Sequence, residues 1–182
     1  MRKGLKVFGC LVALLAIGGA VFYGPTLWDF YKAGLFERPL EPTVYEGDTR
    51  SNLEALHRAL MATHDSDGAF PKASEWMEAI KPRMSTSGEK QWELKYVSPA
   101  LRGKDGQYGY ALNEEVSGRY VDDITDPKTT LLVFDSRDAS WNAHGDPKDL
   151  LPDPPRPGGN LGVTVSGQVV RIEKDGKLTP LP

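Results

Sequence analysis

LGVTVSGQVVRI, residues 161–172, carries the clearest structural signal in this chain. Two apolar, β-branched runs flank Ser166-Gly167, and a Gly in a short connection is typical of a tight β-hairpin. The pattern therefore predicts two antiparallel strands, residues 161–165 and 168–172, joined by a two-residue turn.

Three further strands are predicted upstream of this hairpin. In residues 92–96 apolar and charged side chains alternate, and a period of two favours a half-buried strand. Residues 108–112 form a second candidate. Residues 129–135 are apolar and β-branched enough for a central strand, and Asp126-Pro127 provides the turn before it.

A helix is predicted ahead of the strands. Leu53, Leu56 and Leu60 recur at steps of three and four residues, which places one apolar stripe on one helix face. Ser51 and Glu54 have the spacing of a capping box, so we expect this helix to begin at Ser51.

A second, shorter helix is expected to follow. The first helix should end at residues 65–68, the second should span residues 74–81, and Pro82 should stop it. Helices first and antiparallel strands afterwards predict an α+β fold, in which two helices pack on a small antiparallel sheet.

An uncharged, mostly apolar run, residues 7–28, lies at the N-terminal end, directly after three basic residues. As a helix, roughly 22 residues at about 1.5 Å each would rise about 33 Å, enough to cross a hydrocarbon core of about 30 Å. The positive-inside rule then predicts a single-pass anchor in the lipid bilayer, with the N-terminus cytoplasmic and the following domain periplasmic or extracellular. A cleavable signal peptide, cut after small residues such as Gly18 and Ala20, is the alternative.

These patterns divide the chain into four parts. Residues 1–28 would be a signal anchor, residues 29–48 a juxtamembrane stalk rich in Pro and Gly, residues 49–173 the α+β domain, and residues 174–182 a flexible tail.

Charge and cysteine content limit the function classes. The chain has 22 Lys and Arg against 25 Asp and Glu, a formal net charge of −3. Without the basic residues before the anchor the net charge is about −6, which argues against nucleic acid as a partner. Cys10 is the single cysteine, so the exported domain has no disulfide.

Several short motifs follow one another in a recognisable order. SNL at residues 51–53 precedes HDSDGAFP at 64–71, and YGYALN at 108–113 precedes GGN at 158–160. Over most of the domain this order resembles pilin-like proteins of the type II secretion pseudopilin class. It is especially similar to a family in planctomycete-type bacteria, whose members often end in a His, a spacer and an Asp-Gly hairpin. The resemblance implies a pilin-like fold and contacts with envelope or secretion-system proteins.

The chain departs from that family at both ends. Pilin-like precursors carry a Gly cleavage site with Glu five residues beyond it, and taking Gly4 as the site puts Gly9 at that position. Arg156 stands where the family has its His, and Ser166 replaces the Asp of Asp-Gly. The resemblance therefore implies a pilin-like domain on an uncleaved anchor rather than a processed filament subunit.

Acidic residues give the metal candidates. Asp65 and Asp67 precede Gly68, and alternating carboxylates before a Gly are typical of a calcium loop, although a helix-ending turn is the favoured explanation. Asp122 and Asp123 form a second acidic pair, in the β region where pseudopilins sometimes bind calcium. Apart from calcium at these four residues, no cofactor is expected.

The sequence contains few patterns typical of catalytic sites, and we expect that the protein is not an enzyme. His57 and His64 would lie about 10 Å apart along one helix, too far to share a metal. An envelope hydrolase is a remaining alternative, and it would need a pocket joining His144 and Asp135.

The segment 136–160 is the candidate contact surface. It is rich in Pro, Gly and Asp, and long loops of this kind are usually functional. Trp141, Leu150 and Leu151 are its large apolar residues, and Trp141 would be either a plug into the domain or a partner contact. The sequence therefore predicts a non-enzymatic, membrane-anchored envelope protein that makes protein contacts. A tethered module for calcium or a small ligand is the alternative.

Overall fold

A computed structural model describes residues 43–85 and 89–181 of the protein. The chain divides into two units, residues 1–41 and 42–182. The predicted anchor, residues 7–28, and most of the predicted stalk lie outside the described residues. Within the described ranges, no helix combines the length and the apolar character needed to cross a bilayer.

The described unit contains both helices and a six-stranded sheet, so the predicted α+β class is confirmed. The strand order is β5-β3-β4-β6-β7-β8. All neighbouring strands are antiparallel except β3 and β5, which are parallel. The strands are β3 (Tyr110–Asn113), β4 (Leu131–Asp135), β5 (His144–Gly145), β6 (Asn160–Thr164), β7 (Val169–Ile172) and β8 (Leu178–Pro180). The central position predicted for residues 129–135 is therefore confirmed by β4.

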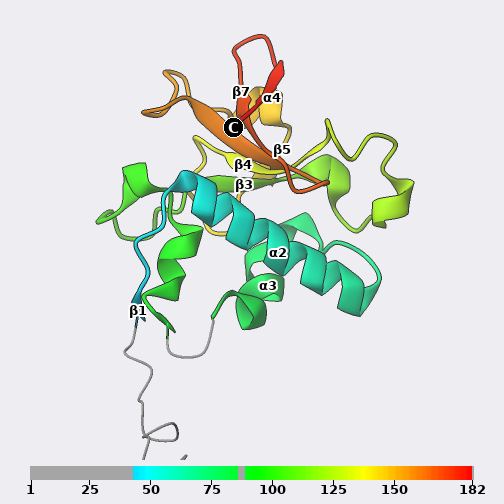
Figure 1. Ribbon diagram of the computed structural model, residues 1–182, viewed down its shortest axis with the longest axis horizontal. Coiled ribbons are helices and arrows are strands. Elements are labelled where there is room, and N and C mark those ends of the chain that lie inside the picture. Colours follow the sequence, from blue (N-terminus) through cyan, green and yellow to red (C-terminus); the bar gives the residue numbers. More distant parts are fainter. Residues whose placement is uncertain (1–42, 86–88, 182) are drawn as a thin grey trace, which may run out of the picture. The chain divides into compact units, whose positions relative to one another are not determined.

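Helices and short turns complete the unit (Figure 1). The α-helices are α2 (Thr49–Asp67), α3 (Trp76–Met84) and α4 (Pro147–Leu150). A small parallel pair joins β1 (Thr43–Val44) to β2 (Glu89–Lys90). Short 3-10 helices are η1 (Ala73–Glu75), η2 (Trp92–Tyr96), η3 (Pro99–Leu101), η4 (Glu114–Val116) and η5 (Val121–Asp123).

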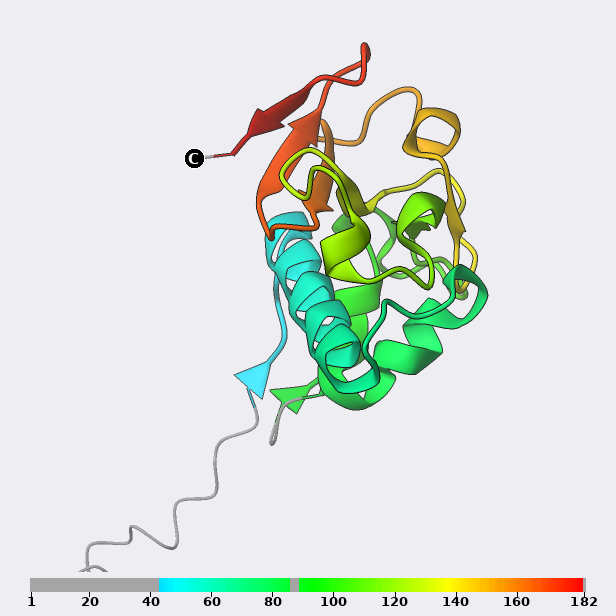
Figure 2. The ribbon, with the colours of Figure 1, turned by 90° about the vertical axis from the view of Figure 1, so that its right-hand side faces the viewer.

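The sheet has a different cover on each face. Buried residues of α2 and α3 form the larger core cluster with one face of the sheet, which includes Leu112 and Val163. Neighbouring strand residues point to opposite faces, and Ala111 belongs to a smaller cluster on the second face. Leu150, Leu151 and Leu178 pack on that smaller cluster. Figures 1 and 2 show α4 and the β7–β8 hairpin at the end of the domain away from α3.

The start of α2 differs from the prediction. The helix begins at Thr49 and its N-cap is Asp48, whose side chain accepts a hydrogen bond from the Ser51 amide at 2.8 Å. A carboxylate caps a helix as well as a hydroxyl does, and Asp48, directly before Thr49 and three residues before Ser51, takes the cap. The predicted end is confirmed, since Gly68 adopts φ 85° and its amide donates to the His64 carbonyl at 2.7 Å.

The prediction that Pro82 stops the second helix is wrong. Pro82 lies inside α3, which continues to Met84. Met84 is buried in the larger core cluster, and its carbonyl accepts a hydrogen bond from Lys95 Nζ at 3.0 Å. Burial and this bond offset the backbone hydrogen bond that a Pro removes.

The strand predicted at residues 92–96 is wrong, because these residues form the 3-10 helix η2. The consecutive residues Lys95 and Tyr96 are both buried, which a strand with one buried face does not allow. Gln91 enters η2 in the left-handed region at φ 60°, and the Asn52 side-chain amide donates to the Val97 carbonyl at 2.9 Å.

The predicted hairpin is present with a longer turn. Val163 pairs with Val169 and the Thr164 amide donates to the Gln168 carbonyl at 3.0 Å, which leaves three residues, 165–167, at the tip instead of two. Gly167 adopts φ 88° and donates to the Thr164 carbonyl at 2.9 Å, the geometry of a three-residue hairpin with a left-handed Gly. The predicted flexible tail is wrong for residues 178–180, because they form β8 on the edge of the sheet.

Candidate functional site

The segment 136–160 is ordered and covers part of the second sheet face. The short strand β5 and the single-turn helix α4 lie within it. Asp146 starts α4 by accepting a hydrogen bond from the Lys148 amide at 2.9 Å, and Pro147 follows at the first helical position, where its missing N–H has no effect. The predicted loop is therefore a folded excursion between β4 and β6.

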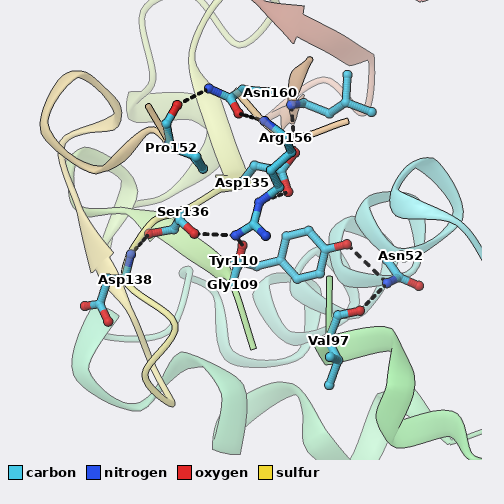
Figure 3. A network of polar contacts seen from close by, with 11 residues as sticks. Asn52, Val97, Gly109, Tyr110, Asp135, Ser136, Asp138, Pro152, Arg156 and Asn160 are labelled. Atoms are coloured by element: carbon cyan, nitrogen blue, oxygen red, sulfur yellow. Dashed lines mark hydrogen bonds and ion pairs between the residues drawn. The ribbon is translucent and has the colours of Figure 1, made fainter. Parts of the chain in front are cut away.

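A cluster of polar residues joins the two ends of this excursion. We call Asp135, Ser136, Arg156 and Asn160 the polar clasp (Figure 3). Arg156 Nε lies 3.4 Å from Asp135 Oδ1, and Arg156 Nη2 donates to the Ser136 carbonyl at 2.5 Å. The same Nη2 donates to the Gly109 carbonyl at 3.2 Å. One guanidinium thus connects the approach to β3, the end of β4 and the end of the excursion.

Asn160 completes the clasp on the β6 side. Its Oδ1 accepts from the Arg156 amide at 3.1 Å, and its Nδ2 donates to the Pro152 carbonyl at 2.9 Å. Asp135 Oδ2 accepts from the Leu161 amide at 2.8 Å. Asn160 therefore fixes the returning chain where β6 begins.

The clasp places a charged pair inside the domain. Asp135 is 1% exposed, and the Arg156 side chain is 12% exposed. Burial raises the pKa of Asp135 to about 6, against the opposing effects of the Leu161 amide and the Arg156 guanidinium. At neutral pH the carboxylate is therefore charged and needs Arg156 as its counter-ion.

Trp141 anchors the middle of the excursion to the helical side of the domain. Its ring centroid lies 5.2 Å from that of Tyr96 and 4.8 Å from that of Tyr108. Its indole N–H donates to the Glu78 carboxylate. Burial by itself would raise the pKa of Glu78, but the hydrogen bonds from Trp141 and Asn142 hold that pKa below its ordinary value. The ring and the N–H of Trp141 are both engaged within the domain.

Leu150 and Leu151 lie on the other side of the excursion, against the smaller core cluster. Leu151 also lines a cavity of about 980 Å³ on the second sheet face, which we call the sheet cavity. Leu131 and Ile172 contribute from β4 and β7, and Leu178 contributes from β8. Of the three contact candidates predicted from sequence, Leu151 is the one that lines this cavity.

Charged side chains surround the sheet cavity. Two cations line it together with five acidic residues: Lys148 and Lys174, with Glu114, Glu115, Asp146, Glu173 and Asp175. The acids come from η4, from the start of α4 and from the β7–β8 turn, so they approach the cavity from three segments. The result is a negative rim around apolar residues.

The four calcium candidates occupy two neighbouring segments. The Val121 amide donates to His64 Nε2 at 3.1 Å, which brings the end of α2 next to η5. Asp65 and Asp67 are exposed at that helix end, and Asp122 and Asp123 are exposed in η5. Among the described residues there is no group of three or more His, Cys, Asp or Glu that could hold a metal ion.

His144 and Asp135 are held on opposite sides of one strand. His144 pairs with Leu112 of β3, and Asp135 pairs with Tyr110 of the same strand from the other side. Neither residue lines the sheet cavity or the smaller cavity of about 310 Å³ beside it. The joint pocket that the hydrolase alternative required is therefore not formed by these two residues.

The sequence patterns did not single out Arg156 or Asn160 as residues that hold the excursion in place. A signal for Arg156 was present: Asp135 ends an apolar strand, and a buried carboxylate requires a cation or several donors. Comparison of the chain with protein-family models, with curated proteins and with solved structures finds no match. A proposal of function therefore rests on the residues and their geometry.

Proposed function

We propose that this chain is a non-enzymatic, single-pass membrane protein that presents a pilin-like α+β domain outside the cytoplasm. Its role is protein contact, as an accessory of a secretion or pilus system. The order of helices and strands, with a long α2 against an antiparallel sheet, agrees with the resemblance to pseudopilins. The apolar run at residues 7–28 supplies the anchor.

The observation that carries the contact role is the sheet cavity. Residues of α2 and α3 pack on one sheet face, whereas the second face carries the sheet cavity beside the excursion. Concave sites with apolar walls and a few polar groups are the usual places for ligands and partner side chains. The polar clasp and Trp141 hold the excursion in place, so this surface is formed before a partner arrives.

Crosslinking in intact cells tests the contact role. A photo-crosslinking amino acid placed at Lys148, on the rim of the sheet cavity, should give a discrete adduct with an envelope protein. The same amino acid at Arg58, which is exposed on α2, serves as the matched control. Adducts from Lys148 and none from Arg58 support the proposal. Equal labelling from both positions, or no adduct from Lys148, contradicts it.

Membrane extraction tests the anchor separately. The protein, expressed with its native N-terminus, should remain in the membrane after an alkaline wash and should keep the mass of the full chain. Release with loss of about 20 residues would instead identify a cleaved signal peptide. Loss of the first four residues alone would show pilin-type processing.

A further inference from the structure

Gly162 shapes the apolar floor of the sheet cavity. A Cβ atom at this position would lie 2.8 Å from Leu131 Cδ2 and 3.1 Å from Ile172 Cδ1. Because Gly162 has no side chain, Leu131 and Ile172 close over β6 from the strands on either side of it. Their side chains form a continuous aliphatic floor, and Leu151 and Leu178 line the cavity beside it.

The rim of this cavity selects for positive charge. Several of its acids already have partners: Glu115 pairs with Arg119 at 3.8 Å, Asp146 caps α4, and Asp175 accepts from the Lys177 amide. Within the described residues, the side chains of Glu114 and Glu173 have no such partner. A concave surface with low-dielectric walls concentrates the field of like charges, so these carboxylates favour a cationic occupant.

In the part of the chain that the structure describes, β8 is an edge strand of the sheet, and it adjoins the same cavity. Glu173 donates to the Lys177 carbonyl, and Leu181 donates to the Val169 carbonyl, so these pairs are the hydrogen-bonded pairs of the β7–β8 ladder. In an antiparallel ladder the intervening residues direct their amides and carbonyls away from the partner strand. Leu178 therefore presents its N–H and C=O at the open edge of β8, while its side chain lines the cavity.

We infer that the sheet cavity binds an extended basic segment of a partner protein. The segment adds to the edge of β8 opposite Leu178, and the residue paired with Leu178 projects onto the same sheet face. An aliphatic side chain of the segment packs on Leu178 at the margin of that floor, and a neighbouring Lys or Arg meets Glu173. This inference deepens the proposed contact function and rests on it.

Charge favours a different protein over a second copy of this chain. The sequence carries more acidic than basic residues, 25 against 22, and the basic residues before the anchor are expected on the cytoplasmic side. Two negatively charged domains would repel one another at an acidic rim. The occupant is therefore a basic segment supplied by a partner outside the cytoplasm.

A binding experiment tests the inference with the full chain in detergent. The probe is a fluorescein-labelled peptide, Gly-Lys-Leu-Val-Lys-Gly, and fluorescence anisotropy reports its binding. The first control peptide replaces both Lys by Glu, and the second replaces Leu and Val by Ser. We expect the probe to bind, the Glu peptide not to bind, and the Ser peptide to bind at least about tenfold more weakly.

Two charge reversals locate the site. E173K changes the rim, whereas E93K makes the same change on an exposed residue of η2, which does not line the cavity. We expect E173K to weaken binding at least about fivefold and E93K to leave it within about twofold. Hydrogen exchange should also slow in the segment containing Leu178 when the probe binds, because its amide gains an acceptor.

Other results overturn the inference. Equal weakening by E93K and E173K would indicate attraction to the overall negative charge, and equal binding of the Glu peptide would remove the electrostatic argument. No probe binding, together with crosslinks from Lys148, would exclude a basic segment and leave the contact function standing. Absence of crosslinks from Lys148 would instead reject the contact function itself.

Discussion

Arg156 and Asp135 form an ion pair in which each charge is tolerated because the other is present. The carboxylate is 1% exposed and the distance between Arg156 Nε and Asp135 Oδ1 is 3.4 Å. Taking either charge out of water is costly, and the guanidinium recovers part of that energy by donating to the carbonyls of Ser136 and Gly109. The pair therefore fixes where the excursion begins and ends more than it adds stability.

Removal of the cation should be strongly destabilising. We expect Arg156→Met to lower the free energy of unfolding by about 3–5 kcal/mol, since Asp135 is left buried and unpaired. Arg137→Met is the matched control, because Arg137 is exposed, and it should change stability by less than about 0.5 kcal/mol. Urea denaturation followed by circular dichroism measures both. Equal losses of stability in the two variants would show that the buried ion pair matters no more than an exposed arginine.

The pH dependence of stability should report the same carboxyl group. Its pKa is raised from 3.8 to about 6 in the folded protein, so the fold favours the neutral form. This contribution is fully present below about pH 4 and is lost as pH rises through about 6, by up to about 3 kcal/mol.

Asp135→Asn removes the titrating group and should remove this dependence. Relative to the variant, the wild-type protein should gain stability as the pH falls from 7 toward 4. Urea midpoints at several pH values provide the test, and parallel curves for the two proteins would contradict it.

At the scale of elements, the sequence pattern predicted the presence of α2 but not the residue that caps it. The leucine spacing predicted the helix, because the same three residues are buried against the sheet. It did not give the cap, since Asp48 and Ser51 are both good capping residues and the choice depends on the chain direction before the helix.

Two substitutions distinguish these caps. Asp48→Ala should lower the free energy of unfolding by about 1 kcal/mol, and Ser51→Ala should have a clearly smaller effect. The Ser51 amide donates to Asp48 and holds the pKa of Asp48 below its ordinary value. The charged cap therefore stabilises the helix fully when the pH is above the ordinary pKa of Asp, and this stabilisation is lost as the pH falls through the lowered pKa. Urea denaturation at neutral pH measures which of the two substitutions lowers the free energy of unfolding more. A larger loss for Ser51→Ala would restore the predicted capping box.

Alternation of polar and apolar residues was a poor guide for residues 92–96 and a good one for the C-terminal hairpin. In the hairpin both strands pair along four residues and bury their β-branched side chains. In η2 the charged Lys95 is buried instead, where it reaches the Met84 carbonyl and the Glu89 carboxylate. A long-range partner of this kind is not visible in local periodicity, so tertiary contacts overrode the pattern.

For the molecule as a whole, the sequence predicted the α+β class but not the cavity that residues 136–160 help to form. The cavity depends on a missing side chain at Gly162, on an ion pair across 21 residues and on β8, which had been assigned to a flexible tail. Each is a relation between distant segments. Local patterns describe single segments, so they do not contain this information.

Truncation after Glu173 tests the role of the C-terminal strand. The shortened chain lacks β8, exposes the edge of β7 and loses the contribution of Leu178 to the sheet cavity. We expect a lower melting temperature and loss of peptide-probe binding. Unchanged melting and binding would mean that residues 174–182 are the dispensable tail that the sequence suggested.

The polar clasp closes the excursion at its base, so its exposed residues are held in place without themselves contributing to the core. Residues 145–155 lie between Trp141 and Arg156, which both attach the excursion to the rest of the domain. The exposed positions of this stretch can therefore accept substitutions without unfolding the domain, as long as Leu150 and Leu151 stay packed on the smaller core cluster. Related proteins that differ at these exposed positions would present different surfaces to their partners, while the core of the domain stays the same.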